Sequence, residues 1–323
     1  MVVAHNMKVL LAGTNGYIST KLIPVLLEKG HDVICLVHDK RRFNEQNDFS
    51  GQVTIITGDL LKESSVEAFP EDIDAAYYLA HSMSQAQDFA ALEVLSAYNF
   101  IHALDKTNCR QTIFLSGIGI DGNRSIHSES RRHVEDVLKK GKPALTVLRT
   151  ALIIGQGGAS FEIIRDLTEK FPVIAGQRWM NTRCQPIAIC DVLGYLESVM
   201  LNERTFNKTF DIGGRDILTF KEMILIYAKV RHLKRYIINI PFLSPKISSY
   251  WLSLITSTGY MMAQNLVNSM KHETIVHNHS IDHIILRKCL TYEEALNLAF
   301  VSVQPTSTAL KSKELLTNEQ VNQ

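Results

Sequence analysis

The sequence has almost no net charge, few prolines and cysteines, and no long uninterrupted apolar run. Its 34 lysines and arginines nearly balance 33 acidic residues in a chain of 323, so the net charge is +1. This balance argues against a protein that binds nucleic acid through a broad basic face. Hydrophobic residues make up 46% of the chain, which excludes a disordered, collagen-like or coiled-coil protein. We expect one large globular domain or two moderate ones, at roughly 100–200 residues per domain.

The cysteines are odd in number and have no close pairs, so they do not form a disulfide framework. They are Cys35, Cys109, Cys184, Cys190 and Cys289. Free thiols indicate a reducing compartment, and the residues before Met7 do not resemble a signal peptide. We therefore expect a cytoplasmic protein.

No stretch of ~18 uninterrupted apolar residues predicts a transmembrane helix. The nearest candidate, Ile247–Val267, is interrupted by serines, threonines and a glycine. We interpret it as a buried helix or a pocket wall, and a peripheral membrane contact through one face stays open as the alternative.

Apolar runs alternate with amphipathic stretches along the first half of the chain. The runs predict six buried strands: Met7–Ala12, Asp32–Val37, Val53–Thr57, Ala75–Ala80, Thr112–Ser116 and Leu145–Arg149. Stretches with helical spacing lie between them, among them one that ends at Gly30, Gln85–Lys106 and Ser130–Lys140. Continuous apolar strands alternating with helices predict a parallel sheet covered on both faces, which is a doubly wound α/β fold of the Rossmann type.

The second half is less regular. We expect helices over Phe161–Lys170, Asp191–Leu201 (with Asp191 as its N-cap), Phe220–Val230, Ser248–Met270 and Tyr292–Phe300, and a strand over Thr209–Ile212. The predicted division is a dinucleotide-binding part (1–155), then remaining strands with a mostly helical substrate-binding lid (156–306), then a polar tail (307–323).

The sharpest motif is a glycine-rich turn between the first strand and the first helix, Gly13-Thr14-Asn15-Gly16-Tyr17-Ile18-Ser19. Gly13 permits a tight turn. Gly16 lets the backbone approach a pyrophosphate, which binds the free N–H groups at the helix N-terminus. Ser19 replaces the usual third glycine and is small enough for close packing. In this βαβ context the turn predicts that residues 13–18 bind a dinucleotide, with a plain strand–helix turn as the alternative.

The residues after the second strand bear on the choice of cofactor. NAD sites usually have an acidic residue there for the ribose hydroxyls, whereas this chain has His38 followed by Asp39-Lys40-Arg41-Arg42. A basic cluster suits a 2′-phosphate, so NADP(H) is favoured, with His38 and Arg41 as contacts. The alternative is that these basic residues form a solvated loop. NAD(H) also stays a possible cofactor, because Asp39 could bind the ribose hydroxyls.

Two further strand ends supply predicted cofactor contacts. Asp59 and Leu60 follow the third strand, where Asp59 could reach the adenine amino group, and Leu79 and Ala80 follow the fourth.

On these residues the sequence resembles the short-chain dehydrogenase/reductase superfamily, in its extended and atypical branches. The supporting strings are the glycine turn, Gly58-Asp59-Leu60, Tyr78-Leu79-Ala80, Ser116, and Leu148-Arg149-Thr150 through Gly155. Residues 76–83, 159–162, 185–188 and 248–252 are most similar to the NAD(P)H-binding, nucleoside-diphosphate-sugar-epimerase-like group that includes relatives of the complex I 39-kDa subunit. The resemblance covers about residues 7–300 and implies a Rossmann fold and a nicotinamide cofactor.

The resemblance also implies a catalytic serine with a tyrosine–lysine pair, spaced YxxxK, on the helix after the fifth strand. The only pair with this spacing is Tyr17–Lys21, which lies in the glycine turn and the first helix. Where the pair is expected, His127 and Arg131 are four residues apart and share a helix face. Imidazole can do acid/base work, and Arg131 can hold ribose hydroxyls or stabilise an oxyanion. The alternative is that catalysis is lost and both residues only bind cofactor or cap the helix.

Two other residues are catalytic candidates. His81 follows the fourth strand and is a second candidate acid or base, with a hydrogen-bonded histidine lining the cofactor pocket as the alternative. Ser116 could orient a substrate carbonyl, or could be a turn residue before Gly117.

These observations predict an NADP(H)-binding oxidoreductase or epimerase-like enzyme that transfers hydride to or from a carbonyl or hydroxyl carbon. The apolar, hydroxyl-rich segment Ile247–Val267 favours a small hydrophobic, quinone-like substrate over a nucleotide sugar. The missing tyrosine–lysine pair leaves open a non-catalytic NADPH-binding redox sensor or assembly factor. We expect no nucleic-acid partner, and no metal site, because His272, His277, His279 and His283 lack metal-motif spacing.

Overall fold

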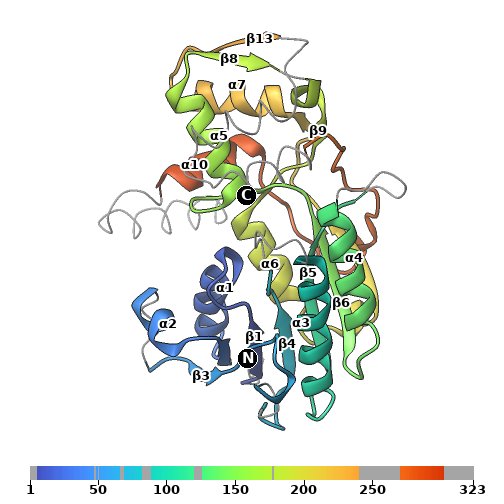
Figure 1. The fold of residues 1–323 in the computed structure, drawn as a ribbon. Helices are drawn as coiled ribbons and strands as arrows, with labels where there is room; N and C mark the ends of the chain where they lie inside the picture. The colour runs from blue at the N-terminus through green and yellow to red at the C-terminus, as the bar shows by residue number, and fades with distance from the viewer. Residues whose placement is uncertain are drawn as a thin grey trace, which may run out of the picture.

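A seven-stranded parallel sheet forms the centre of the molecule (Figure 1). The computed structural model describes residues 6–46, 49, 51–65, 69–81, 89–119, 126–176, 178–239 and 270–301. The strands of the sheet are β1 (Lys8–Ala12), β2 (Asp32–Val37), β3 (Thr54–Thr57), β4 (Ala75–Tyr78), β5 (Gln111–Gly117), β6 (Ala144–Thr150) and β11 (Lys208–Ile212). The predicted Rossmann-type α/β fold is confirmed, and each predicted strand is present.

The order of the strands reverses between β1 and β4. The full order is β11-β6-β5-β4-β1-β2-β3, so the chain builds outward from β1 to β3 and then returns to build the other half from β4. At the reversal Leu11 of β1 pairs with Cys35 of β2 on one side and with Tyr77 of β4 on the other. The loops that leave β1 and β4 diverge there and open a crevice at the carboxyl edge, where open α/β sheets bind ligands.

Helices cover both faces of the sheet because successive side chains of a strand point to opposite sides. Helices α1 (Tyr17–Glu28) and α6 (Ile189–Val199) pack on the face that holds Leu11 and Cys35. Helices α3 (Phe89–Leu104) and α4 (Ile126–Leu138) pack on the face that holds Leu10 and Ile34. The continuous apolar strands thus supply two hydrophobic cores at once.

A third core lies outside the sheet, at the top of Figure 1. It contains α5 (Ala159–Lys170), α7 (Phe220–Val230) and α10 (Tyr292–Val301), together with the parallel pair β8 (Val173–Gly176) and β13 (Tyr236–Asn239). Because β11 and α6 rejoin the main sheet, residues after 155 contribute to both regions. The predicted division of the chain at residue 155 stays a prediction.

The remaining described elements are short. They are α2 (Lys40–Gln46), β7 (Ile153–Ile154), β9 (Arg183–Cys184), β10 (Ile187–Ala188), β12 (Leu218–Thr219) and the 3-10 turns η1 (Glu63–Ser65), η2 (Arg178–Asn181), η3 (Glu203–Thr205) and η4 (Ser280–His283). The basic residues after the second strand therefore begin a helix.

The prediction that Asp191 caps a helix is wrong. Helix α6 begins at Ile189, which places Asp191 inside its first turn. The buried Asp191 carboxylate instead accepts hydrogen bonds from Arg287 Nε at 3.0 Å and from the Leu290 backbone N–H at 2.8 Å. Its role is to attach the C-terminal segment to α6, a contact across almost a hundred residues that local spacing does not reveal.

Other helix predictions differ from the structure at their ends. Helix α4 begins at Ile126 rather than at Ser130, and α3 is described from Phe89 to Leu104. The segment Ile247–Val267, nearly all of the predicted helix Ser248–Met270 and the predicted tail 307–323 lie outside the described residues. Among the helices that are described, none combines the length and the apolar character needed to span a bilayer.

Candidate functional site

A cleft of about 860 Å³ opens at the carboxyl edge of the sheet, where the strand order reverses between β1 and β4. This size lies within the range of ligand pockets, roughly 300–1,000 Å³. The wall consists of residues 13–19, 36–38, 58–60, 79–81, 115–117, 131, 150, 151, 153 and 157–160. These include all the predicted site residues except Arg41, which is exposed outside the wall, and His127, whose side chain lies outside the described residues.

The glycine turn is held between two strand ends. Gly13 has φ +86°, and a Cβ atom on it would lie 2.4 Å from the backbone nitrogen of Ala80, after β4. The Gly16 N–H donates to the Gly13 carbonyl at 3.0 Å. Thr14 Oγ1 donates to the carbonyl of Leu36, near the end of β2, at 3.1 Å. Glycine at position 13 is thus required by both its backbone conformation and the close approach of β4.

Helix α1 starts directly at the cleft wall. Its N-cap residue is Gly16, and no side chain there bonds to the first turn. The N–H groups of a first helical turn have no partner within the helix, so this end can bind an anionic group. Ser19 is fully buried, as its predicted packing role requires.

The ends of β2 and β3 place His38 and Asp59 at the cleft. This aspartate is not Asp39, the residue that leaves NAD(H) as the alternative cofactor. His38 Nε2 lies 3.8 Å from Asp59 Oδ2, and both residues line the cleft. Asp39 lies outside the lining, and its Oδ1 accepts the backbone N–H of Arg41 at 2.8 Å and that of Arg42 at 3.4 Å. The Asp39 carboxylate therefore caps the start of α2.

Two buried hydroxyls at the other end of the cleft have no hydrogen-bond partner in the described part of the chain. They belong to Ser116 in β5 and Thr150 at the end of β6. A buried polar group without a partner costs about 1–3 kcal/mol, so orphaned hydroxyls in a cleft wall fit a ligand that completes their bonding. Thr150 is absent from the predicted site, although it stands in the string from Leu148 to Gly155 that carries part of the resemblance.

Arg131 fixes the ends of β4 and β5 from helix α4. Its Nη1 donates to the Ala80 carbonyl at 3.3 Å and its Nη2 to the Leu115 carbonyl at 2.5 Å. The guanidinium carbon lies 4.3 Å from the ring centroid of Phe114. Burial lowers the pKa of Arg131, while the charge of Glu93 acts in the opposite direction, and a guanidinium stays protonated in proteins. A buried positive charge therefore lines the cleft.

His81 belongs to a polar cluster that the sequence did not predict. Its Nδ1 lies 2.7 Å from Oε1 of Glu93, a residue of α3 that is 4% exposed. The other Glu93 oxygen accepts a hydrogen bond from Ser130 Oγ of α4 at 2.5 Å. The one feature of the sequence that could have pointed to Glu93 is its acidic side chain within a largely apolar helix.

Tyr17 does not reproduce the superfamily's tyrosine. Its hydroxyl is buried against Gly155, where a Cβ atom would lie 2.4 Å from it. Burial, helped by the charges of Glu162 and Cys190, raises the pKa of Tyr17, which is opposite to what a catalytic base needs. Lys21 Nζ lies 5.4 Å from the ring centroid, over its face. The spacing of Tyr17 and Lys21 therefore reflects packing.

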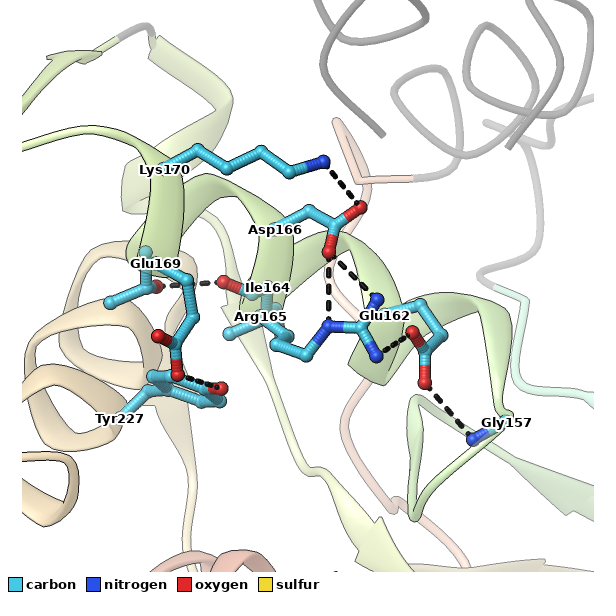
Figure 2. A network of polar contacts seen from close by, with 9 residues as sticks. Gly157, Glu162, Ile164, Arg165, Asp166, Glu169, Lys170 and Tyr227 are labelled. Atoms are coloured by element: carbon cyan, nitrogen blue, oxygen red, sulfur yellow. Dashed lines mark hydrogen bonds and ion pairs between the residues drawn. The ribbon is translucent and has the colours of Figure 1, made fainter. Parts of the chain in front are cut away.

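The 155–158 turn, which packs against Tyr17, is held by a polar network in α5 (Figure 2). The N–H of Gly157, which has φ +83°, donates to Glu162 Oε1 at 3.1 Å. Glu162 pairs with Arg165, whose Nε donates to Asp166 Oδ1 at 3.0 Å. Lys170 Nζ lies 3.1 Å from the second oxygen of Asp166. This chain of charges attaches the 155–158 turn to α5.

Comparison with known proteins agrees with this geometry. Residues 9–137 match the family described as NAD dependent epimerase/dehydratase. The match is confined to this segment, which is less than half of the chain. The match covers the glycine turn, the end of β4 and most of α4, and it confirms the resemblance to short-chain dehydrogenases/reductases that the sequence predicted.

Individual relatives are distant. The 40 kDa subunit of mitochondrial NADH-ubiquinone oxidoreductase from Neurospora crassa is 22% identical over 237 residues, 71% of this chain. The match spans only 61% of that relative's length.

Two solved structures share the fold at low identity. An NADPH-dependent quinone oxidoreductase from Escherichia coli superposes with a TM-score of 0.71 at 14% identity, covering 91% of this chain and 100% of its own. The Bordetella bronchiseptica enzyme WbmH, solved with NAD+, has a TM-score of 0.68 at 14% identity, with coverage of 93% and 99%.

Proposed function

We propose that this chain binds NADP(H) and transfers hydride between the nicotinamide and a carbonyl or hydroxyl carbon of a small hydrophobic substrate. The observation that carries the proposal is a single cleft that joins the glycine turn to polar side chains at the ends of β4, β5 and β6. One end suits a pyrophosphate, and the other offers hydroxyl and imidazole groups to a reacting oxygen. When bound, the cofactor would supply or accept the hydride, while the residues of the chain bind and orient both molecules.

The lining residues fit a dinucleotide along the length of the cleft. The approach of β4 to Gly13 leaves no room for a side chain, and the uncapped start of α1 is free for phosphate oxygens. Asp59 and Leu60 would contact the adenine, and Leu79 and Ala80 would flank the middle of the cofactor. The orphaned hydroxyls of Ser116 and Thr150 would face the nicotinamide or the substrate.

The structure around the end of β2 supports NADPH over NADH. Asp39 does not line the cleft, and its Oδ1 accepts two backbone N–H groups at the start of α2, so its carboxylate serves the helix and not the cleft. The exposed Arg41 lies in the first turn of the same helix, three residues after the lining residue His38. A guanidinium there is suited to a 2′-phosphate.

Apolar lining and the names of similar proteins support a quinone-like substrate. Leu115, Ala151 and Ile153 line the cleft beyond the glycine turn. The similar Escherichia coli structure is named as a quinone oxidoreductase, and the similar Neurospora protein as a subunit of NADH-ubiquinone oxidoreductase. Two-electron reduction of a quinone to a hydroquinone consumes one hydride, which the cofactor would supply, and one proton, which the polar end of the cleft could supply.

The test has two stages. Purified protein is titrated with NADPH and with NADH while the nicotinamide fluorescence is followed, and oxidation of NADPH is then measured against a panel of quinones, aldehydes and ketones. We expect tighter binding of NADPH and turnover of at least one quinone. Equal or tighter binding of NADH would overturn the choice of NADP(H), and binding of neither would overturn the whole proposal.

A non-catalytic role is the second candidate, because α4 carries no tyrosine–lysine pair with the YxxxK spacing. A wild-type protein that binds NADPH but oxidises it with no member of the panel would favour a redox sensor or assembly factor over an oxidoreductase.

A further inference from the structure

His81, Glu93 and Ser130 form a hydrogen-bonded cluster at the cleft wall. Three elements supply it: the loop after β4, helix α3 and helix α4. His81 lines the cleft with a side chain that is 25% exposed, whereas the Glu93 side chain behind it is 4% exposed. The imidazole therefore stands between the cleft and a buried carboxyl group.

The surroundings of Glu93 keep it ionised. Burial acts to raise the pKa of Glu93, but the hydrogen bonds from His81 and Ser130 and the charge of Arg131 outweigh it, and the pKa falls below its usual range. An ionised carboxylate only accepts hydrogen bonds. The proton between the two side chains therefore belongs to His81 Nδ1, whether the ring is neutral or charged, and Nε2 is the nitrogen that can exchange a proton with a ligand.

We infer that His81 is the proton donor and acceptor of this site and that Glu93 positions it, in place of the missing tyrosine–lysine pair. The inference rests on the proposed function. In the reducing direction the carbonyl carbon takes the hydride of a reduced nicotinamide dinucleotide, which is thereby oxidised. The carbonyl oxygen takes the Nε2 proton of the His81 imidazolium, so the product is a hydroxyl and the ring is left neutral, with the proton on Nδ1 still donated to Glu93.

The other charged groups around the cluster are compatible with this role. Arg131 reaches the same region from α4, and its charge favours ionised Glu93. Tyr78 of β4 has a pKa that burial raises, so it stays a neutral phenol. Ser130 donates to the second oxygen of Glu93 and so leaves the first oxygen for His81.

A second histidine–glutamate pair serves as a matched control. His102 Nε2 lies 3.5 Å from Glu63 Oε1, and the two side chains are 44% and 58% exposed, away from the residues that line the cleft. Both pairs include a histidine and a glutamate, but only His81 faces the cleft. Substitution of His102 by glutamine should leave turnover unchanged.

The kinetic test compares His81→Gln, Glu93→Gln and His102→Gln with the wild type, using NADPH and the quinone or carbonyl compound that the wild type reduces. General acid–base catalysis contributes about 10²–10⁴-fold, so we expect His81→Gln to lower kcat by about that factor with little change in KM or in the Kd for NADPH. His81→Gly should regain turnover when imidazole is added to the buffer, and a merely structural histidine would not respond. A His81→Gln variant that keeps the kcat of the wild type would overturn the inference.

A second measurement does not depend on turnover. The nitrogen shifts of the His81 ring, recorded by NMR on 15N-histidine-labelled protein, report which nitrogen of the neutral ring carries the proton. We expect a proton on Nδ1 in the wild type and a shift toward Nε2 in Glu93→Gln, because the amide can itself donate to Nδ1. A wild-type ring protonated on Nε2 would overturn the positioning role of Glu93 even if Glu93→Gln failed to fold.

The two proposals fail differently. A wild type that binds NADPH but reduces no compound refutes the oxidoreductase, and the proton-transfer role falls with it. A wild type that is active while His81→Gln keeps its kcat refutes only the inference about His81.

Discussion

Replacing Gly13 by alanine separates two reasons for a glycine at the start of the cofactor cleft. The first is conformational, because the φ of +86° places a side chain in the left-handed region, at a cost of roughly 1–2 kcal/mol. The second is the approach of β4, since the new Cβ atom would lie 2.4 Å from the backbone nitrogen of Ala80 and 2.5 Å from the carbonyl carbon of Leu79. Overpacking of this kind typically costs about 1–3 kcal/mol.

Gly30 is the matched control because it shares only the first of these features. Its φ is +82°, and a Cβ atom there would meet nothing within 4 Å. We expect Gly30→Ala to lower the free energy of unfolding in urea by about 1–2 kcal/mol and Gly13→Ala to lower it by about 2–5 kcal/mol. The difference isolates the contact between the glycine turn and β4.

Binding provides the second readout of the same pair of variants. Relief of the clash must move either the glycine turn or the end of β4, and both line the cleft. The Kd for NADPH should therefore rise by about tenfold or more in Gly13→Ala, equivalent to at least about 1.4 kcal/mol, and stay unchanged in Gly30→Ala. Equal losses of stability in the two variants, or wild-type binding by Gly13→Ala, would refute this reasoning.

Three further substitutions test other contacts. Arg41→Glu should raise the Kd for NADPH by about tenfold or more, a loss of about 1.5–3 kcal/mol for a charged hydrogen bond, and leave the Kd for NADH unchanged in the same fluorescence titration; equal effects on both cofactors would contradict it. Thr14→Val removes the 3.1 Å hydrogen bond to the Leu36 carbonyl and should lower the free energy of unfolding by about 1–3 kcal/mol, measured in urea. Glu135→Ala leaves the Arg149 guanidinium, 15% exposed, without its partner and should cost about 3–5 kcal/mol in the same assay; an unchanged midpoint would show that the pair adds nothing.

The features that the sequence predicted well depend on neighbours in the chain. A buried parallel strand is recognisable from its own four to seven residues, and β11 was predicted as readily as β1. The glycine turn is equally local, since Gly13 and Gly16 need only the strand before them and the helix after them. The helix that carries Arg131 could also be predicted from its own residues. Val134 and Leu138, which follow Arg131 at helical spacing, are fully buried.

The features that were missed depend on contacts between distant segments. Asp191 has the residue type and position of an N-cap, but Arg287 and Leu290 use its carboxylate from the other end of the chain. Thr150 stands at the end of β6 like many strand-end threonines, and only its orphaned hydroxyl in the cleft wall distinguishes it.

Glu93 shows why the polar end of the cleft could not be derived from spacing. It is twelve residues from His81 and thirty-seven from Ser130, and it becomes their common partner only because α3 and α4 pack side by side on one face of the sheet. The superfamily pattern places the proton donor on the helix that is α4 here and therefore predicts His127 and Arg131. The structure instead uses Arg131 to hold the carbonyls of Ala80 and Leu115. The imidazole with a carboxylate behind it lies on the loop after β4, the strand next to β1. The inference about His81 therefore assigns the acid/base role to that loop and not to α4.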